Sequence, residues 1–222
     1  MEFYAKSKPD VLTIVEHTND VVNAVEVLRH SYGERLFLLT NTDWNVLKLA
    51  AYYHDIGKYS DGFQNAIKSS IFKAKRENLI NYPHNYLSVG LIPFKKFMKE
   101  YLPEDLEILA LIVGFHHERE QPNSKDIERI INEQLFEHLE LIKKELNLQI
   151  TEKISPLFLR LLENRNRFWS GRSEFDTQQK RYILLKGLLH RADYAASSKR
   201  KFESVEQYVE QGVSENVGDQ TR

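Results

Sequence analysis

Apolar residues recur at three- and four-residue steps along most of the chain, the spacing that places side chains on one face of a helix. The first run extends from Val11 to Leu28 and places His17 inside the predicted helix. A second helix is predicted to begin at Asp43 as its N-cap and to end at Gly57, with His54 on its apolar face. Both helices therefore carry a histidine that can face a core.

Further helices follow the same periodicity, and prolines and capping residues mark several of their boundaries. They are predicted over 61–78, over 84–101 with a kink at Pro93, over 103–114, over 125–146 with Ser124 as N-cap, from Ser155 with Pro156 in the first turn, and from Asp176 or Thr177. No convincing hairpin pattern is present. The sequence therefore predicts an all-α domain, a compact bundle of about seven or more helices.

Length and a change of composition near the C-terminus define the domain organisation. The chain has 222 residues, enough for one large core, and residues 1–202 form the predicted domain. Residues 203–222 are polar and are predicted to form a C-terminal tail or linker. Charges occupy the N-terminus where a signal peptide needs an apolar run, and no apolar stretch approaches about 18 residues. We therefore expect a soluble, cytoplasmic protein with no membrane partner.

Composition and charge exclude several classes of function. The chain has 31 lysines and arginines against 32 aspartates and glutamates, and a net charge of −1 excludes the strong basicity of a histone-like protein that coats DNA. Because there is no cysteine, disulfides, zinc-thiolate sites and thiol catalysis are excluded. Any metal ion must therefore be held by nitrogen and oxygen ligands.

Seven histidines and aspartates occupy positions that are unusual for purely structural residues. They are His17, His54, Asp55, His84, His116, His117 and Asp193. An ionised aspartate is almost never fully buried unless it is paired or bound to a metal, yet Asp55 ends an apolar helix and Asp193 lies on an apolar stripe. A lone histidine is more often a hydrogen-bonded structural residue than a ligand. The complete set favours a metal site over that alternative.

The order of these residues resembles a known family. The segments YYHDIGK and LLHRADYAAS, together with His17, are similar to the H…HD…D pattern of the HD phosphohydrolase superfamily. His84, the doublet in GFHHE and the opening EFYAKS resemble one branch more closely. That branch is the HD nuclease domain of the CRISPR-associated type I effector nuclease-helicase. The resemblance extends from about Tyr4 to Ser198.

The resemblance implies a site for two divalent metal ions. It places His17, His54, Asp55 and Asp193 around one ion, and His84, His116 and His117 around the second, with Asp55 bridging the two. Ligands that are mostly imidazole suit a transition metal such as Mn, Co, Ni or Fe better than Mg, although they do not identify the metal. Two such ions support metal-assisted hydrolysis of a phosphodiester.

Lys58 is the second predicted catalytic residue beside Asp55. It lies about one helical turn beyond His54 and could neutralise charge in the transition state or position the scissile phosphate. The alternative interpretation is an ordinary solvated lysine. Ser88 and Ser197 also lie near the motifs, where they either support the ligands through hydrogen bonds or pack on helix surfaces.

A basic run with interleaved aromatic residues follows the HDIGK motif. The residues predicted to contact nucleic acid are Lys68, Lys73, Lys75 and Arg76. This composition suits contact with phosphates and bases, but a solvated helix surface is the alternative. Two further basic clusters have the same two interpretations: Lys95, Lys96 and Lys99, and Arg165, Arg167 and Arg172.

The favoured function is a metal-dependent DNA nuclease, endo- or exonucleolytic, that hydrolyses single-stranded DNA in CRISPR interference, an antiviral defence. The resemblance implies a helicase subunit or domain and a guide-RNA surveillance complex as partners. This sequence contains no phosphate-binding G-x-x-x-x-G-K-[ST] loop of a helicase. One alternative is an HD phosphohydrolase that acts on nucleotides or cyclic dinucleotides. Another is a helical docking module whose histidines are structural. The sequence does not decide whether Glu118 or Lys58 donates the proton to the leaving group.

Overall fold

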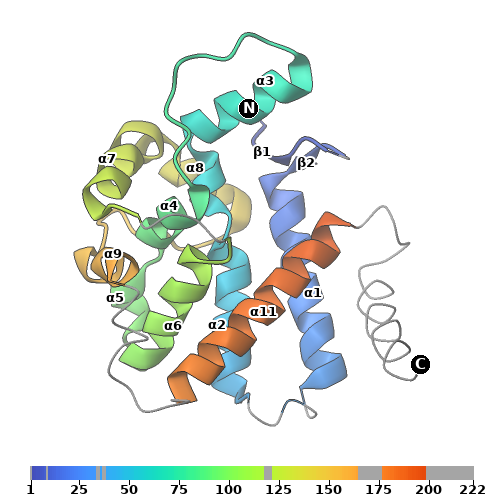
Figure 1. Cartoon of the computed structure of the whole chain (residues 1–222), viewed down its shortest axis with the longest axis vertical. Coiled ribbons are helices and arrows are strands. Elements are labelled where there is room, and N and C mark those ends of the chain that lie inside the picture. Colours follow the sequence, from blue (N-terminus) through green and yellow to red (C-terminus); the bar gives the residue numbers. More distant parts are fainter. Residues whose placement is uncertain are drawn as a thin grey trace.

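The structure is a computed structural model that describes residues 2–8, 10–33, 36, 39–117, 122–164 and 177–198. These residues form ten α-helices, two short 3-10 helices and two strands (Figure 1). The helices are α1 (Ile14–Tyr32), α2 (Asn41–Tyr53), α3 (Asp61–Phe72), α4 (His84–Leu91), α5 (Phe94–Phe97), α6 (Pro103–Gly114), α7 (Ser124–Gln134), α8 (Leu139–Leu146), α9 (Pro156–Glu163) and α11 (Thr177–Ser197), with the 3-10 helices η1 (Ile56–Tyr59) and η2 (Phe136–His138). The predicted helical fold class is confirmed.

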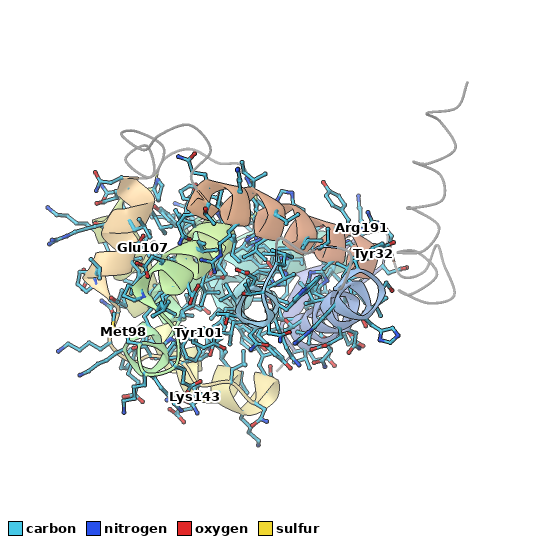
Figure 2. The ribbon with its side chains drawn as sticks, turned by 90° about the horizontal axis from the view of Figure 1, so that it is seen from below. Tyr32, Met98, Tyr101, Glu107, Lys143 and Arg191 are labelled. Carbon is cyan, nitrogen blue, oxygen red and sulfur yellow. The ribbon has the colours of Figure 1, made fainter. Side chains whose placement is uncertain are left out.

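Four helices build the centre of the molecule. Helix α1 packs against α2 and α11, and α6 packs against both α2 and α11. Figure 1 shows that α2, α6 and α11 run in one direction and α1 in the opposite one. The C-terminal ends of three helices therefore meet the N-terminal end of α1 at one end of the bundle. The interior is filled by apolar side chains of all four helices, whereas Lys143 and Arg191 lie toward the edge of the molecule (Figure 2).

Buried ionic contacts hold the opposite end of the bundle. Arg181, in the first turns of α11, donates to Asp43 Oδ1 at 2.7 Å and to Asp105 Oδ1 at 2.5 Å. Thr40 is the N-cap of α2, because its hydroxyl accepts from the Asp43 N–H at 3.2 Å, and the Asp43 carboxylate accepts from the Thr40 N–H at 2.7 Å in return. The prediction of Asp43 as N-cap is therefore wrong, because its carboxylate closes a capping box from the third helical position. Arg181 ties the N-terminal ends of α2, α6 and α11 together.

Two predicted helices are shorter than the apolar pattern indicated. The segment 84–101 is divided into α4 and α5, because Ile92, which precedes Pro93, adopts extended backbone angles. The predicted helix over 61–78 ends at Phe72, and Lys73 takes the left-handed conformation that terminates many helices. The apolar periodicity also stops there, so the polar residues that follow do not continue the helix.

The predicted helix over 125–146 is interrupted and begins with a different cap. Asn123, rather than Ser124, is the N-cap, and its side chain accepts from the Lys125 N–H. The 3-10 helix η2 separates α7 from α8 and places His138 Nε2 2.9 Å from Asp61 Oδ1. Leu135 and Leu139 are buried on either side of this interruption. The apolar spacing therefore continues across the break and conceals it in the sequence.

A small antiparallel sheet lies beside α3 and α1. Its strands are β1 (Tyr4–Lys6) and β2 (Leu12–Thr13), with Tyr4 opposite Thr13. The sequence did not predict it, because two or three residues are too few to show an alternating pattern. Gln64 of α3 accepts from the Tyr4 N–H at 3.0 Å and donates to the Tyr4 carbonyl at 2.9 Å. The buried amide of Gln64 therefore fixes β1 to α3.

Several expectations concern regions that cannot be compared with the structure. The tail at 203–222, the cluster of Arg165, Arg167 and Arg172, and Glu118 lie outside the described residues. Within the described residues, no helix combines the length and apolar character that crossing a membrane requires.

Candidate metal centre

The seven predicted metal ligands come together at the end of the bundle where the four central helices meet. The N-terminal part of α1 carries His17, the end of α2 is followed by His54 and Asp55, α4 begins at His84, α6 is followed by His116 and His117, and the last turns of α11 carry Asp193. Helix ends and first turns position six of them, so small changes in helix direction would separate the set. Five are buried, and His117 and Asp193 are half-buried.

The carboxylate of Asp55 lies at the centre of the cluster. Its Oδ2 atom is 3.2 Å from His17 Nε2 and 3.4 Å from His54 Nε2. Its Oδ1 atom is 3.1 Å from His84 Nε2 and 3.7 Å from His116 Nε2. The two oxygens of one carboxylate therefore face two different sets of imidazoles.

These contacts define two groups of possible metal ligands. In one group, His84, His116 and His117 offer nitrogen atoms within 4.8 Å of one another. In the other, the ligand atoms of His17, His54 and Asp55 satisfy the same limit. Asp193 adjoins the second group, with Oδ1 3.1 Å from His17 Nε2. The described residues therefore contain two adjacent His/Asp clusters that share Asp55 as a neighbour.

The orientation of two imidazoles favours a cation in the cluster. His54 Nδ1 lies 2.8 Å from the Ala51 carbonyl and His116 Nδ1 lies 2.7 Å from the Val113 carbonyl. A carbonyl oxygen only accepts, so both Nδ1 atoms carry a hydrogen, and in the neutral ring the Nε2 atom keeps its lone pair. Each Nε2 lone pair then faces a carboxylate oxygen of Asp55. Two acceptors at this separation repel each other unless a cation lies between them.

Several buried polar atoms in the cluster make no hydrogen bond. They are His54 Nε2, His84 Nε2, His116 Nε2 and Asp55 Oδ1. Buried polar atoms are nearly always hydrogen-bonded, so a group of such atoms pointing at one another needs an explanation. Bonds to divalent ions would satisfy all four, and an imidazole bonded to a carbonyl through Nδ1 is the usual form of a histidine that binds metal through Nε2. The residues present therefore fit a metal site.

Protonation states in the cluster also suit metal binding. Burial lowers the pKa of His84 to about 3 and that of His117 to about 4. Burial opposes ionisation of Asp55, but its contacts with the surrounding imidazoles and with the Lys58 ammonium outweigh burial and hold the Asp55 pKa well below its ordinary value. His84 and His117 are therefore neutral imidazoles and Asp55 is an ionised carboxylate, the forms that bind a metal.

His17 differs from the other histidines because it lies between two carboxylates. Burial works against its positive charge, but hydrogen bonds to Asp193 and Asp55 raise its pKa. Burial alone would raise the pKa of Asp193. The hydrogen bond from His17 more than offsets burial, so the Asp193 pKa lies below its ordinary value. A proton on His17 would have to leave when a metal ion binds there.

Lys58 lies inside the cluster rather than in solvent. Its side chain is only 10% exposed, and Nζ donates to Asp55 Oδ2 at 2.6 Å. Nζ also lies 5.6 Å from the centre of the Phe63 ring. The interpretation of Lys58 as an ordinary solvated lysine is therefore wrong. Its catalytic role stays a prediction.

Ser88 of α4 connects the segments that carry three ligands. Its Oγ donates to the His54 carbonyl at 2.8 Å and accepts from the Gly57 N–H at 2.9 Å. A Cβ atom at Gly57 would collide with the His84 carbonyl, so glycine is required for η1 to pack against α4. The predicted end of the second helix at Gly57 is wrong, because α2 ends at Tyr53 and Gly57 serves this packing instead.

Replacing Ser88 by alanine is expected to lower the free energy of unfolding by about 1–3 kcal/mol. The variant leaves the His54 carbonyl and the Gly57 N–H buried without this partner. Urea denaturation of the metal-free protein measures the loss, with Ser70→Ala, an exposed serine of α3, as the control that should change stability by less than about 0.5 kcal/mol. Equal stability of the two variants would contradict the role assigned to Ser88.

A cavity of about 490 Å³ opens onto the cluster. Its lining includes His17, His84, His117, Asp193 and Lys58, and also Lys6 of β1 and Phe63 of α3. The sequence analysis did not single out Lys6 as a site residue, and the only signal was its place in the opening EFYAKS. The predicted contacts Lys73, Lys75 and Arg76 are exposed beyond the end of α3 and do not line this cavity. Neither does Lys68, whose Nζ lies 5.0 Å from the Phe3 ring.

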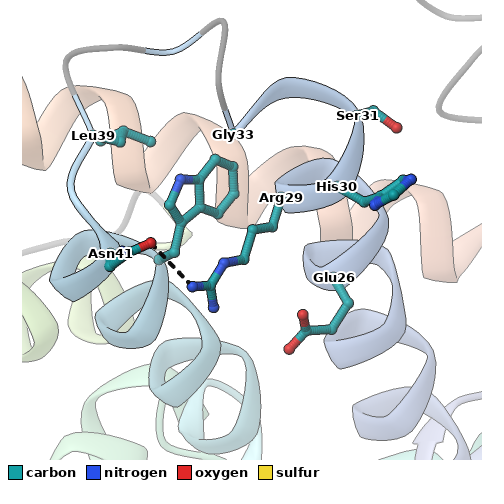
Figure 3. Close-up of a pocket in the computed structure, with 8 residues that line it drawn as sticks. Glu26, Arg29, His30, Ser31, Gly33, Leu39 and Asn41 are labelled. Atoms are coloured by element: carbon teal, nitrogen blue, oxygen red, sulfur yellow. Dashed lines mark hydrogen bonds between the residues drawn. The ribbon is translucent and has the colours of Figure 1, made fainter.

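A larger cavity of about 720 Å³ lies at the other end of α1 (Figure 3). Glu26, Arg29 and Trp44 line it, and Arg29 donates to Asn41 Oδ1 at 3.2 Å. Neither His/Asp cluster found among the described residues borders this cavity. Of these two cavities, the smaller one is therefore the one that the candidate metal ligands line.

Comparison with known proteins agrees with the geometry. The family model described as Cas3, HD domain matches residues 4–202. Among solved structures, the chain is similar to the CRISPR-associated Cas3 HD domain protein MJ0384 from Methanocaldococcus jannaschii, with a TM-score of 0.55 and 21% identity over 87% of this chain and 99% of that chain. At this identity the likeness supports the fold alone. Comparison with curated proteins gives no match.

Proposed function

Because this chain belongs to the Cas3 HD-domain family, we propose that it is a metal-dependent nuclease that hydrolyses the phosphodiester bonds of single-stranded DNA in CRISPR interference. The observation that carries the proposal is the placement of Asp55, whose two carboxylate oxygens face two different groups of imidazole nitrogens. A purely structural cluster would satisfy these atoms with hydrogen bonds. A pair of divalent ions would satisfy them and supply hydrolytic chemistry.

Each group would hold one divalent ion. The first ion would be held by His17, His54, Asp55 and Asp193, and the second by His84, His116 and His117 with Asp55. When bound, two divalent ions polarise a phosphodiester and activate water for its hydrolysis. Imidazole nitrogens are the majority of the ligands, so Mn, Co, Ni or Fe should support activity better than Mg.

Lys58 would supply positive charge to the scissile phosphate. Its ammonium contacts the Asp55 oxygen that also faces His17 and His54, so occupation of that oxygen by another cation requires Lys58 to move. The side chain already lines the cavity, which gives it a direction in which to move. In the cavity, the Lys58 ammonium would lie close to the phosphate oxygens on which negative charge develops in the transition state.

The substrate strand and the partners of the reaction follow from the family. A helicase subunit or domain would supply the unpaired strand, and a guide-RNA surveillance complex would select the DNA. This chain would contribute the hydrolytic step, with the cavity over the metal centre as the place where the strand enters.

The volume of the cavity favours one alternative function. About 490 Å³ lies within the range of small-molecule sites, so a nucleotide or a cyclic dinucleotide would also fit. Such a substrate would use the same two groups of ligands, since the reaction is again hydrolysis of a phosphoester.

Hydrolysis of labelled circular and linear single-stranded DNA separates these functions. The protein is stripped of metal, and Mn, Co, Ni or Mg is added back separately. We expect no cleavage without metal and faster cleavage with Mn, Co or Ni than with Mg. Loss of the circle identifies an endonuclease, whereas loss of the linear strand alone identifies an exonuclease.

Two outcomes would overturn the proposal. If both DNA substrates survive with every metal while nucleotides or cyclic dinucleotides are hydrolysed, the small-substrate alternative replaces it. If no phosphoester is hydrolysed with any metal, the histidines are structural and the helical docking module is the better interpretation.

A further inference from the structure

Two parts of the lining of the cavity over the metal centre differ in chemistry. The first, called the cationic side, comes from β1 and the residues after it and carries Lys6 and Lys8. The second, called the apolar side, comes from α3 and presents the uncharged side chains of Phe63, Ala66 and Ile67. Lys58 of η1 is a further cationic side chain of the lining. A ligand in this cavity therefore meets both positive charge and apolar surface.

Lys6 is held in place on the cationic side. Its Nζ donates to the Ser197 carbonyl at 3.3 Å, in the last turn of α11, four residues beyond Asp193. Gln64, which bonds to Tyr4 of β1, also donates to the Lys58 carbonyl at 2.7 Å. The buried amide of Gln64 therefore links β1, which carries Lys6, to the backbone of Lys58 in η1. Lys8 is exposed and extends the same side outward.

The apolar side is also fixed relative to the metal centre. The half-buried Phe63 ring packs edge-on against the His84 ring, with 5.6 Å between their centres. Ala66 and Ile67 continue this surface one turn further along α3. An aromatic ring beside small apolar residues is a surface on which a nucleic-acid base stacks, without preference for its identity.

We propose that Lys6 and Lys8 bind the phosphate backbone of an unpaired strand, and that the α3 side around Phe63 receives its bases. The inference rests on the proposed nuclease function and adds the orientation of the strand to it. A cationic side that follows the backbone and an aromatic surface for the bases are the two parts of sequence-independent single-strand binding. In a duplex the base faces are stacked inside, so the α3 side would have nothing to contact. The cavity therefore selects unpaired nucleic acid.

The position of Lys6 and Lys8 distinguishes them from the basic run predicted from the sequence. Lys73, Lys75 and Arg76 lie outside the cavity lining, whereas Lys6 lies next to Ser197 and lines the cavity together with Asp193. In the metal-free protein, ionised Asp55 and Asp193 repel a phosphate, and the positive charges of Lys6 and Lys8 offset this repulsion.

The test measures binding of a fluorescent single strand by anisotropy at several salt concentrations in EDTA. Loss of two phosphate contacts should reduce the slope of log affinity against log salt by about 1.4, at about 0.7 per contact for single strands. The Lys6→Met/Lys8→Met variant should therefore bind about 25-fold more weakly at 0.1 M salt, taking equal affinity at 1 M salt. Lys6→Arg/Lys8→Arg should restore binding. The exposed pair Lys144→Met/Lys153→Met is the matched control and should bind as the parent does.

A second variant tests the apolar side. Phe63→Leu should weaken binding of the single strand without changing the salt slope, because stacking involves no phosphate charge. It should leave binding of a duplex of the same length unchanged. An equal loss for single strand and duplex would overturn the assignment of the bases to α3.

Different results would contradict the nuclease function and the assignment of Lys6 and Lys8. Hydrolysis of bis(p-nitrophenyl) phosphate, a small diester that does not follow the cavity outward, is measured on the unmodified protein and on Lys144→Met/Lys153→Met, which should hydrolyse it at the same rate. If the unmodified protein hydrolyses neither this diester nor DNA with any metal, the nuclease function fails. If it hydrolyses both but the lysine variants keep the full salt slope and affinity, the function stands and the assignment of Lys6 and Lys8 is wrong. Lys8→Met alone covers the case in which Lys6→Met does not fold.

Discussion

Replacing Asp55 by asparagine is expected to reduce metal-dependent hydrolysis by more than about 100-fold. Its two carboxylate oxygens contact four imidazoles and Lys58, so one substitution affects both groups of ligands. Loss of a residue that only supports a metal ligand already costs about 10–100-fold. Asparagine has nearly the same shape but only one oxygen and no charge, so it cannot balance the charge of two divalent ions.

The same substitution should abolish stabilisation by metal. A ligand that binds only the folded state stabilises it by about 2.7 kcal/mol when its concentration is 100 times the dissociation constant. Mn should therefore raise the melting temperature of the unmodified protein but not that of Asp55→Asn. Asp126→Asn, an exposed aspartate paired with Arg129 on α7, serves as the control and should keep both activity and stabilisation. Unchanged stabilisation of Asp55→Asn by Mn would contradict the placement of the metal site.

Replacing Arg181 by methionine is expected to lower the free energy of unfolding by about 3–5 kcal/mol. The guanidinium lies between the buried carboxylates of Asp43 and Asp105, and removal of the cation leaves both without their ionic partner. Burial alone would lower the Arg181 pKa, but hydrogen bonds to Asp105 and Asp43 outweigh it and raise that pKa. The positive charge is therefore permanent, and its loss is not compensated by solvent.

A matched arginine elsewhere on the surface provides the comparison. Arg129 of α7 pairs with Asp126 and Glu133, but all three side chains are about half exposed. Exposed ion pairs contribute about 0–1 kcal/mol, so Arg129→Met should have a small effect on stability. Urea denaturation of both variants without metal measures the difference. A loss for Arg181→Met no larger than that for Arg129→Met would show that the buried contacts do not hold the three helices together.

The candidate ligands could be predicted from the sequence because helix boundaries place them. His54 and Asp55 follow an apolar helix, and His116 and His117 follow another, so both pairs had to lie at helix ends. The periodicity of the last helix placed Asp193 on its apolar stripe. The sequence did not show that α2, α6 and α11 run in the same direction, and this arrangement is what brings the pairs together. Only the resemblance to a family supplied that arrangement in advance.

The contacts that depend on distant segments could not be predicted. Arg181 looks like an exposed residue at the start of a helix, and its partners Asp43 and Asp105 lie 138 and 76 residues away. Lys6 is near the metal centre because it lies on a three-residue strand that pairs with β2 and is bonded to Gln64, and this strand is too short to show a pattern. The break at η2 was hidden because buried leucines continue the helical spacing on both sides of it.

The central claim is that two metal ions bind around Asp55, and anomalous diffraction from crystals grown with Mn tests it most directly. We predict two anomalous peaks, both beside Asp55, one also adjoining His17 and His54 and the other also adjoining His84 and His116. Asp193 and His117 should complete the two sets of ligands. No peak beside Asp55, or peaks only at surface carboxylates, would contradict the account.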